Sequence, residues 1–246
     1  MSVTVVVLSV LIGAALQSAT GFGFALVTAP VMFAVFAPGE ALTLLVILAT
    51  VLSVLVLLTE RRDVDIAWGG ALPLAAWGIP GLAVGVVILR AVDKPVLQVA
   101  VGLAVIAAAA LELRGRPAAG GPPQRWPLPP VGLLAGTLAT TVGVNGPPMM
   151  MYLLRTGADQ HRVRDTMSAT FLLYTPLVVA ALVAGGLLGL GDVGVAELAA
   201  LLAMVAVGRP LGRALFIRLD AGTFRWVALG LALAAGVGSL AAGLAG

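Results

Sequence analysis

Two stretches rich in glycine and hydrogen-bonding side chains interrupt otherwise apolar sequence. The first reads Gln17-Ser-Ala-Thr-Gly-Phe-Gly23, and the second reads Thr140-Thr-Val-Gly-Val-Asn-Gly-Pro-Pro148. Glycine and proline break helices. A helix that restarts after a break presents free N–H groups and a partial positive charge at its N-terminus, and proline suits its first turn. The two breaks therefore favour the binding of a small anion.

The residues that we expect to contact this anion lie in or beside the breaks, apart from one arginine in a later segment. They are Gln17, Ser18, Thr20, Gly21, Phe22, Gly23, Thr140, Thr141, Gly143, Asn145, Gly146 and Arg209. Polar groups in lipid need partners, which a bound anion would supply. The alternative is packing alone, because small residues let membrane helices approach closely and Ser and Thr can bond their own backbone.

Arg209 and Arg213 are four residues apart and share one helix face. The position that corresponds to Arg209 in the first half of the chain is Leu82. Two interpretations stay open for Arg209: contact with the substrate, or a side chain that extends along the helix to the cytoplasmic surface. The rarity of charge inside membranes favours the second interpretation.

The remaining reactive side chains indicate little chemistry. The carboxylates fall in predicted loops or at segment ends, which argues against a carboxylate proton relay or a sodium site built from carboxylates. A sodium ion bound by backbone carbonyls, or a proton carried by the substrate, stays open as the coupling ion. His161, the single histidine, lies within Asp159–Asp165, which reads as a solvated cytoplasmic loop; a pH-sensing gate is the alternative. Without cysteine or further histidines, we expect no cofactor, no metal site and no enzyme.

The composition points to a membrane protein. Of 246 residues, 61% are hydrophobic and 10% are charged, whereas soluble domains carry about 25% charged residues. This excludes a soluble globule and a disordered chain. The net charge is +3 and the basic residues cluster between apolar runs, which argues against nucleic acid as a partner and for the lipid bilayer.

The apolar segments divide the chain into two halves. A spanning helix needs ~20 mostly apolar residues. Residues 113–127 are rich in proline, glycine and arginine and read as a cytoplasmic linker between a first transmembrane repeat, 1–112, and a second, 128–246. The predicted segments are 2–36 (interrupted), 39–59, 67–90 and 95–112, then 128–154 (interrupted), 163–188, 195–216 and 223–245.

The two halves resemble each other at a spacing of roughly 122–127 residues. The two breaks align, and Gly81, Gly85 and Asp93 match Gly208, Gly212 and Asp220. We therefore predict an all-α polytopic fold of two repeats, each a broken-helix, re-entrant-like hairpin followed by three transmembrane helices. Three is odd, so the repeats are inverted, and the tips of the two hairpins can meet near the midplane.

Charge fixes the orientation. Residues 149–154 cannot span ~30 Å at 1.5 Å per residue, so the second broken segment turns back. Residues 2–19 are long enough to cross the membrane. For the first hairpin, the sequence therefore allows either a re-entrant or a fully spanning structure. With hairpins, nearly all basic residues fall on one side, with Arg90 and Lys94 opposite. The positive-inside rule then places both termini outside and the linker in the cytoplasm of a multi-pass protein of the cell (plasma or inner) membrane.

These motifs resemble the TauE/SafE family of sulfite exporters, also called the toluene sulfonate uptake permease family. The resemblance rests on residues 17–30, on the break before Pro147-Pro148 and on the paired glycines. It implies a permease for a small anion such as sulfite, thiosulfate or sulfoacetate. The inverted repeats in turn predict alternating access. An anion channel of the same architecture is the alternative, and a structural scaffold is a third class. Substrate, transport direction and a homo-oligomeric state are not specified by the sequence.

Overall fold

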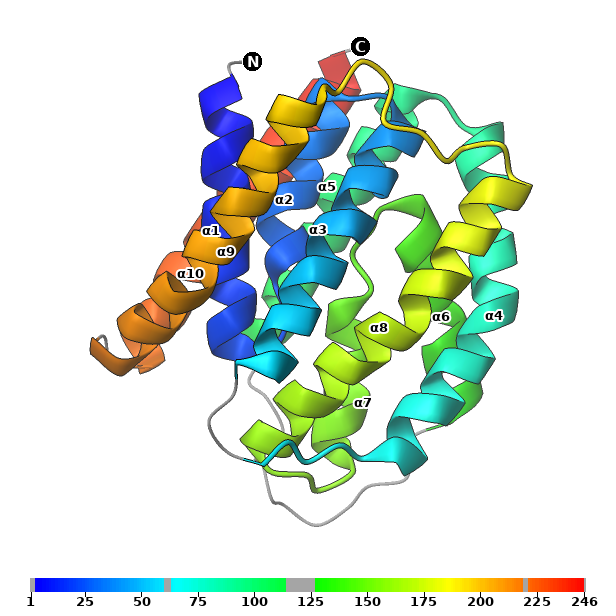
Figure 1. Cartoon of the computed structure of the whole chain (residues 1–246). Helices are drawn as coiled ribbons and strands as arrows, with labels where there is room; N and C mark the ends of the chain where they lie inside the picture. Colours follow the sequence, from blue (N-terminus) through cyan, green and yellow to red (C-terminus); the bar gives the residue numbers. More distant parts are fainter. Residues whose placement is uncertain (1–2, 60–62, 114–126, 219–220, 246) are drawn as a thin grey trace.

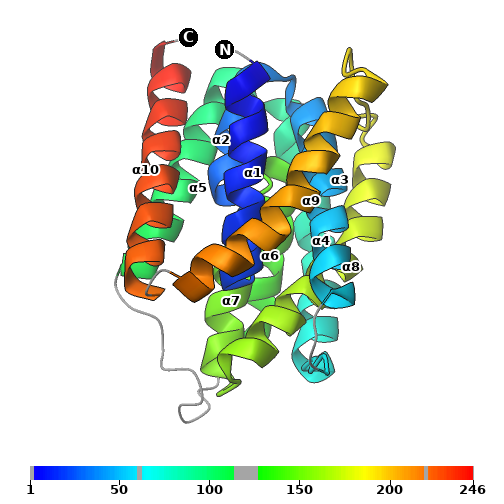
Figure 2. The same ribbon diagram turned by 60° about the vertical axis from the view of Figure 1, so that its left-hand side comes forward.

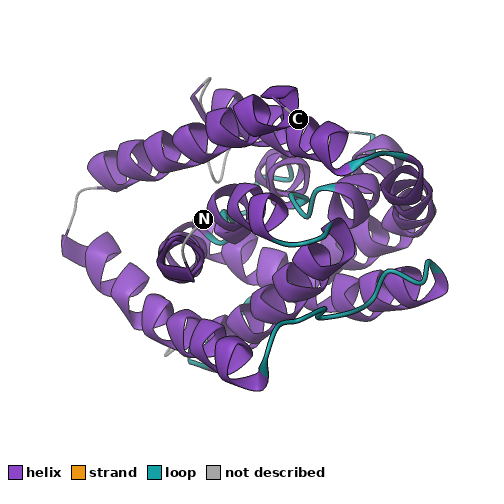
Figure 3. Cartoon of the chain, turned by 90° about the horizontal axis from the view of Figure 1, so that it is seen from above, coloured by secondary structure: helices purple, strands orange, loops and turns teal. Residues whose placement is uncertain are grey.

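The structure is a computed structural model that describes residues 3–59, 63–113, 127–218 and 221–245. In that part the chain is helix joined by loops and turns, with no strand (Figure 3). The all-α prediction is therefore confirmed, while linker residues 114–126 lie outside the described residues. The helices are α1 Val3–Thr20, α2 Phe24–Val35, α3 Pro38–Leu58, α4 Trp68–Ala91, α5 Lys94–Leu113, α6 Leu128–Thr141, α7 Gly146–Arg155, α8 Gln160–Ala184, α9 Val195–Arg218 and α10 Ala221–Ala245.

The lengths of the helices separate spanning from broken elements. Among the described residues, five helices are long and apolar enough to cross a membrane: α3, α4, α5, α8 and α9. The helices after or around the breaks are shorter, with 12 residues in α2, 14 in α6 and 10 in α7. At 1.5 Å per residue they extend about 15–21 Å, less than the ~30 Å hydrocarbon core.

The hairpin α1–α2 starts at the end of the bundle where both termini lie, and the hairpin α6–α7 starts at the opposite end (Figures 1 and 2). The described basic residues follow this division. Arg155, Arg162 and Arg164 lie at the end opposite to the termini, where α7 ends and α8 begins, whereas Arg90 and Lys94 lie at the other end. The predicted one-sided clustering of basic residues thus holds for these positions.

The helices of the two halves pack on each other in a matching pattern. α1 packs on α9 and α6 packs on α4, while α3 pairs with α8 and α5 with α10. Exchanging the first five helices for the last five leaves these pairings unchanged. The glycines matched in the sequence occupy the matching interfaces, because Gly81 and Gly85 of α4 face α6, and Gly208 and Gly212 of α9 face α1. Small residues of this kind let helix backbones approach closely.

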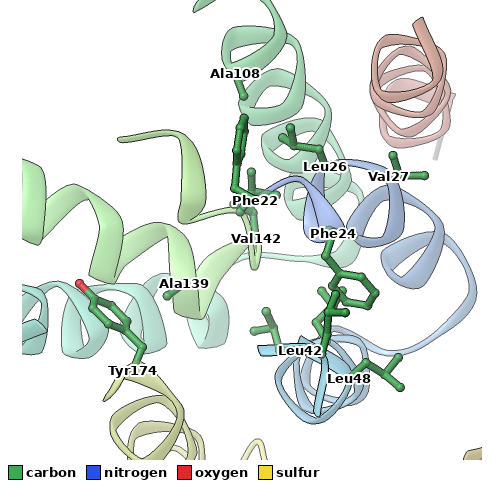
Figure 4. Close-up of a cluster of buried hydrophobic side chains, with 14 of the residues drawn as sticks. Phe22, Phe24, Leu26, Val27, Leu42, Leu48, Ala108, Ala139, Val142 and Tyr174 are labelled. Carbon is green, nitrogen blue, oxygen red and sulfur yellow. The ribbon is translucent and has the colours of Figure 1, made fainter. Parts of the chain in front are cut away.

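A continuous apolar core surrounds the breaks. Phe22 and Val142 from the two breaks and Phe24 at the start of α2 join Leu42 of α3 and Tyr174 of α8 in one buried cluster (Figure 4). The broken backbone is therefore enclosed by protein, as a lipid environment requires of chain whose N–H and C=O groups are not paired within a helix.

Candidate functional site

Glycine sets the geometry of both breaks. α1 ends at Thr20 and α2 begins at Phe24, and between them Gly21 and Gly23 have φ of 86° and 109°. After α6, Gly143 has a φ of 72°. These left-handed conformations are readily available to glycine and costly for other residues. The chain can reverse direction at these points because glycine stands there.

The two breaks meet inside the bundle. A β-carbon placed on Gly146 would lie 3.2 Å from Cβ of Phe22, so the start of α7 rests against the first break. On its other side the first break is backed by α8, since a β-carbon on Gly21 would lie 2.9 Å from Cγ of Arg164. Gly143 packs against Leu45 of α3. The predicted meeting of the hairpin tips is thus present as a contact between residues far apart in the sequence.

One cavity of about 70 Å³ lies between the breaks, α3, α6 and α8. Its volume exceeds the ~15 Å³ that one water needs, so it has room for a few waters or one small ion. The lining is mostly apolar, and polar side chains enter it from four elements or breaks. These are Gln17 of α1, Thr50 of α3, Asn145 of the second break, and Tyr174 and Thr175 of α8.

Half of the residues predicted to contact substrate line this cavity. They come from α1 and from both breaks: Gln17, Phe22, Gly23, Gly143, Asn145 and Gly146. Five others do not line it: Ser18, Gly21, Thr140, Thr141 and Arg209. The side chain of Thr20 lies outside the described residues.

Gln17 is the cavity's most distinctive polar group. It is 3% exposed, and its Nε2 has no hydrogen-bond partner within the part of the chain that the structure describes. A buried donor without an acceptor costs about 1–3 kcal/mol. An acceptor-only ligand in the cavity would remove this cost. Asn145 stands at the N-cap of α7 and likewise makes no capping hydrogen bond with its side chain.

The two helix starts differ in the backbone donors that they offer. Phe24 and Ala25 occupy the first two positions of α2 and line the cavity, and N–H groups at these positions have no acceptor within their own helix. In α7, Pro147 and Pro148 take the second and third positions, and proline has no N–H. The first break therefore offers more backbone donors to an anion than the second.

The threonines before the second break are engaged in packing. The hydroxyl of Thr140 donates to the carbonyl of Leu82 at 2.9 Å, across the interface of α4 and α6. Thr141 donates to the carbonyl of Thr137 one turn back, at 2.7 Å. The packing alternative considered from the sequence describes these two residues.

Arg209 is enclosed by protein. It is 5% exposed on α9, beside Gly208, which packs against Ala14 of α1. The expectation that its side chain extends to the cytoplasmic surface is therefore wrong, because a side chain that reaches water would be exposed. It does not line the cavity. The side chain of Arg213 lies outside the described residues.

The stretch from Asp159 to Asp165 is the start of a helix rather than a solvated loop. Asp159 caps α8 and accepts from the N–H groups of His161 and Arg162. Asp165 is 1% exposed and accepts the N–H of Asp65 at 3.1 Å, because the α3–α4 connection folds over this turn of α8. The loop interpretation was wrong for Asp165, whose burial depends on a segment 100 residues away in the sequence.

Two cavity residues that sequence reasoning missed are Thr50 and Thr175. Their hydroxyl oxygens lie 2.8 Å apart, between the middle of α3 and that of α8. They are 125 residues apart, within the spacing at which the two halves match. Extending the repeat comparison beyond glycine and aspartate would have paired them.

These features define a class of protein: a polytopic helical membrane protein in which two broken hairpins from different halves of the chain line one mostly apolar cavity with a few polar side chains. The sequence matches the family Sulfite exporter TauE/SafE over residues 5–239, nearly the whole chain. The chain therefore belongs to the TauE/SafE family, a family of membrane transporters for sulfur anions. No curated protein and no solved structure matches it.

Proposed function

We propose that this protein carries a sulfur oxyanion or an organosulfonate, such as sulfite, thiosulfate or sulfoacetate, through the cavity between its two breaks. One observation carries the proposal: both breaks line the same cavity, and the buried side chain of Gln17, a donor with no acceptor in the described structure, lines it too. Sulfur oxyanions offer several acceptor oxygens and would satisfy it. The apolar remainder of the lining would exclude water and strengthen those hydrogen bonds.

Alternating access is the mechanism that we propose for this site. The matching interfaces of α1 with α9 and of α4 with α6 support two inverted repeats that rock around a central cavity. Glycine-lined interfaces suit such movement because few side chains interlock across them. The positive-inside rule supports both termini outside and the linker in the cytoplasm of the cell membrane.

Flux measurements in proteoliposomes test this function. We expect saturable uptake of at least one anion from a panel of sulfite, thiosulfate, sulfoacetate, sulfate, acetate and chloride, with exchange against the same anion inside. Flux that never saturates and single-channel currents would instead establish the channel alternative. Folded protein that moves none of these anions, with or without a proton or sodium gradient, would contradict the proposal.

A pair of variants locates the site in the same assay. Asn145→Ala removes a polar side chain from the cavity lining, and we expect it to raise the KM of the transported anion about tenfold, the size of one hydrogen bond to a charged group. Thr141→Ala is the control, because that hydroxyl is bound to its own helix and does not line the cavity. Its KM should stay within about twofold of wild type.

A further inference from the structure

We infer that Thr50 and Thr175 form a hydroxyl pair that donates to the transported oxyanion, one hydroxyl from each half of the molecule. This inference rests on the proposed function and adds two residues to its site. Both residues line the cavity. Each lies near the middle of a helix long enough to cross the membrane, Thr50 in α3 and Thr175 in α8. The pair thus sits at mid-depth, where the substrate must pass.

The hydrogen bonds of the pair leave it free to turn toward a ligand. Thr50 contacts the carbonyl of Val46 at 2.6 Å, Thr175 contacts that of Phe171 at 3.1 Å, and the two hydroxyl oxygens are 2.8 Å apart. The two hydroxyls have only two hydrogens for these three contacts. At any moment, one of the three oxygen–oxygen contacts therefore has no hydrogen in it. A hydroxyl hydrogen rotates without moving its oxygen. Both hydrogens can therefore swing to a ligand while the oxygens stay in place.

Acceptor-only ligands suit this arrangement. Two donors 2.8 Å apart are close enough to serve one oxyanion together, and Gln17 adds a third donor on the same cavity. The carbonyls that the hydroxyls leave remain bonded within their helices, as with any mid-helix threonine that bonds one turn back. The protein therefore gives up little when the hydrogens turn to the substrate.

The equivalence of the two positions gives the pair a particular role. The threonines are 125 residues apart, the spacing that relates the two halves. In transporters built from inverted repeats, access changes sides largely because one repeat rocks against the other around a fixed binding site. A donor present at the same place in both halves would therefore stay with the substrate in both states. Gln17 lacks such a counterpart, because the matching Thr140 is bound to Leu82.

Conservative variants test the pair. Thr50→Val and Thr175→Val keep the shape and remove the hydroxyl, whereas Thr50→Ser and Thr175→Ser keep it. Equilibrium titration of the purified full chain with sulfite, thiosulfate and sulfoacetate would give the Kd. We expect each valine variant to raise the Kd at least tenfold and by similar factors, and each serine variant to stay within about threefold of wild type.

Thr170→Val is the matched control. Thr170 lies on the same helix as Thr175, is fully buried and bonds the carbonyl of Thr166 one turn back at 2.6 Å, but it does not line the cavity. We expect it to change the melting temperature and to leave the Kd unchanged. Valine variants of the pair that lower the melting temperature yet bind with the wild-type Kd would overturn the inference. They would show that the hydroxyl pair only holds α3 and α8 together.

The outcomes separate this inference from the function on which it rests. Suppose that wild-type protein binds and transports an anion, and that Asn145→Ala weakens binding of this anion while neither valine variant does. The inference is then wrong and the proposed function stands. If folded wild-type protein binds none of the three anions, both are overturned. Serine variants that bind the anion as weakly as the valine variants would also overturn the inference, since the hydroxyl would then not be the group that binds the anion.

Discussion

Two buried glutamines show how burial alone does not define a site. Gln98 of α5 is 8% exposed, and its Nε2 donates to the carbonyl of Phe33 at 3.2 Å, which ties α5 to α2. Gln17 is more deeply buried, yet its Nε2 has no acceptor among the described residues and its side chain lines the cavity. The first amide is part of the packing, and the second is available to a ligand.

This contrast predicts opposite effects of the same substitution on stability. Gln17→Met removes a buried donor that lacks an acceptor, and we expect the free energy of unfolding without ligand to stay equal or to rise by about 1 kcal/mol. Gln98→Met leaves the carbonyl of Phe33 without its partner and should lower the free energy of unfolding by about 1–3 kcal/mol. Thermal unfolding in detergent would measure both. A Gln17→Met protein as destabilised as Gln98→Met would contradict the assignment.

At the level of helices, the interface of α4 and α6 depends on residues without side chains. A β-carbon at Gly85 would overlap the hydroxyl of Thr140 and lie 2.6 Å from the carbonyl oxygen of Thr137. A β-carbon at Gly81 would lie 2.8 Å from the backbone nitrogen of Thr137. The helices therefore touch through their backbones, and either substitution must push them apart.

Gly85→Ala should accordingly destabilise the protein. We expect a loss of about 1–3 kcal/mol, the usual cost of overpacking, despite alanine's higher helix propensity. Gly69→Ala on the same helix is the control, because a β-carbon at Gly69 would meet nothing within 4 Å among the described residues. Melting temperature in detergent is the readout. Equal stability of the two variants would show that α4 and α6 are not held in backbone contact.

Helix positions were largely predictable, and side-chain surroundings were not. The interrupted segments 2–36 and 128–154 were predicted as broken hairpins because glycine and proline disrupt a helix locally, and the structure has α1–α2 and α6–α7 there. The burial of Asp165 and Arg209 depends on elements distant in sequence, so no local pattern revealed it. Thr50 and Thr175 look like ordinary helix residues until their mutual contact is seen.

At the scale of the whole molecule, one end carries both termini and the other carries the start of α8 with its charged residues. Arg162 pairs with Asp65 at 3.5 Å on the exposed surface there. Behind it, Arg164 packs against Gly21 of the first break. The cluster at this end therefore borders the hairpin that lines the cavity, and a movement of α8 would be felt at the first break.

The cavity joins these scales, since it exists because two broken hairpins from opposite ends of the bundle meet. Its donors come from α1, α3 and α8 and from the second break, so the site depends on the correct assembly of both halves. Neither half lines it alone. The central claim is that the transported anion occupies this cavity and accepts a hydrogen bond from Gln17.

The most direct test is the affinity of Gln17→Met for the anion that wild-type protein transports, measured by equilibrium titration of both purified proteins. We predict a Kd at least tenfold higher for the variant, the loss of about one hydrogen bond to a charged ligand, with an unliganded melting temperature no lower than that of wild type. An unchanged Kd in a folded Gln17→Met protein would contradict the account, because the bound anion would then not accept a hydrogen bond from Gln17.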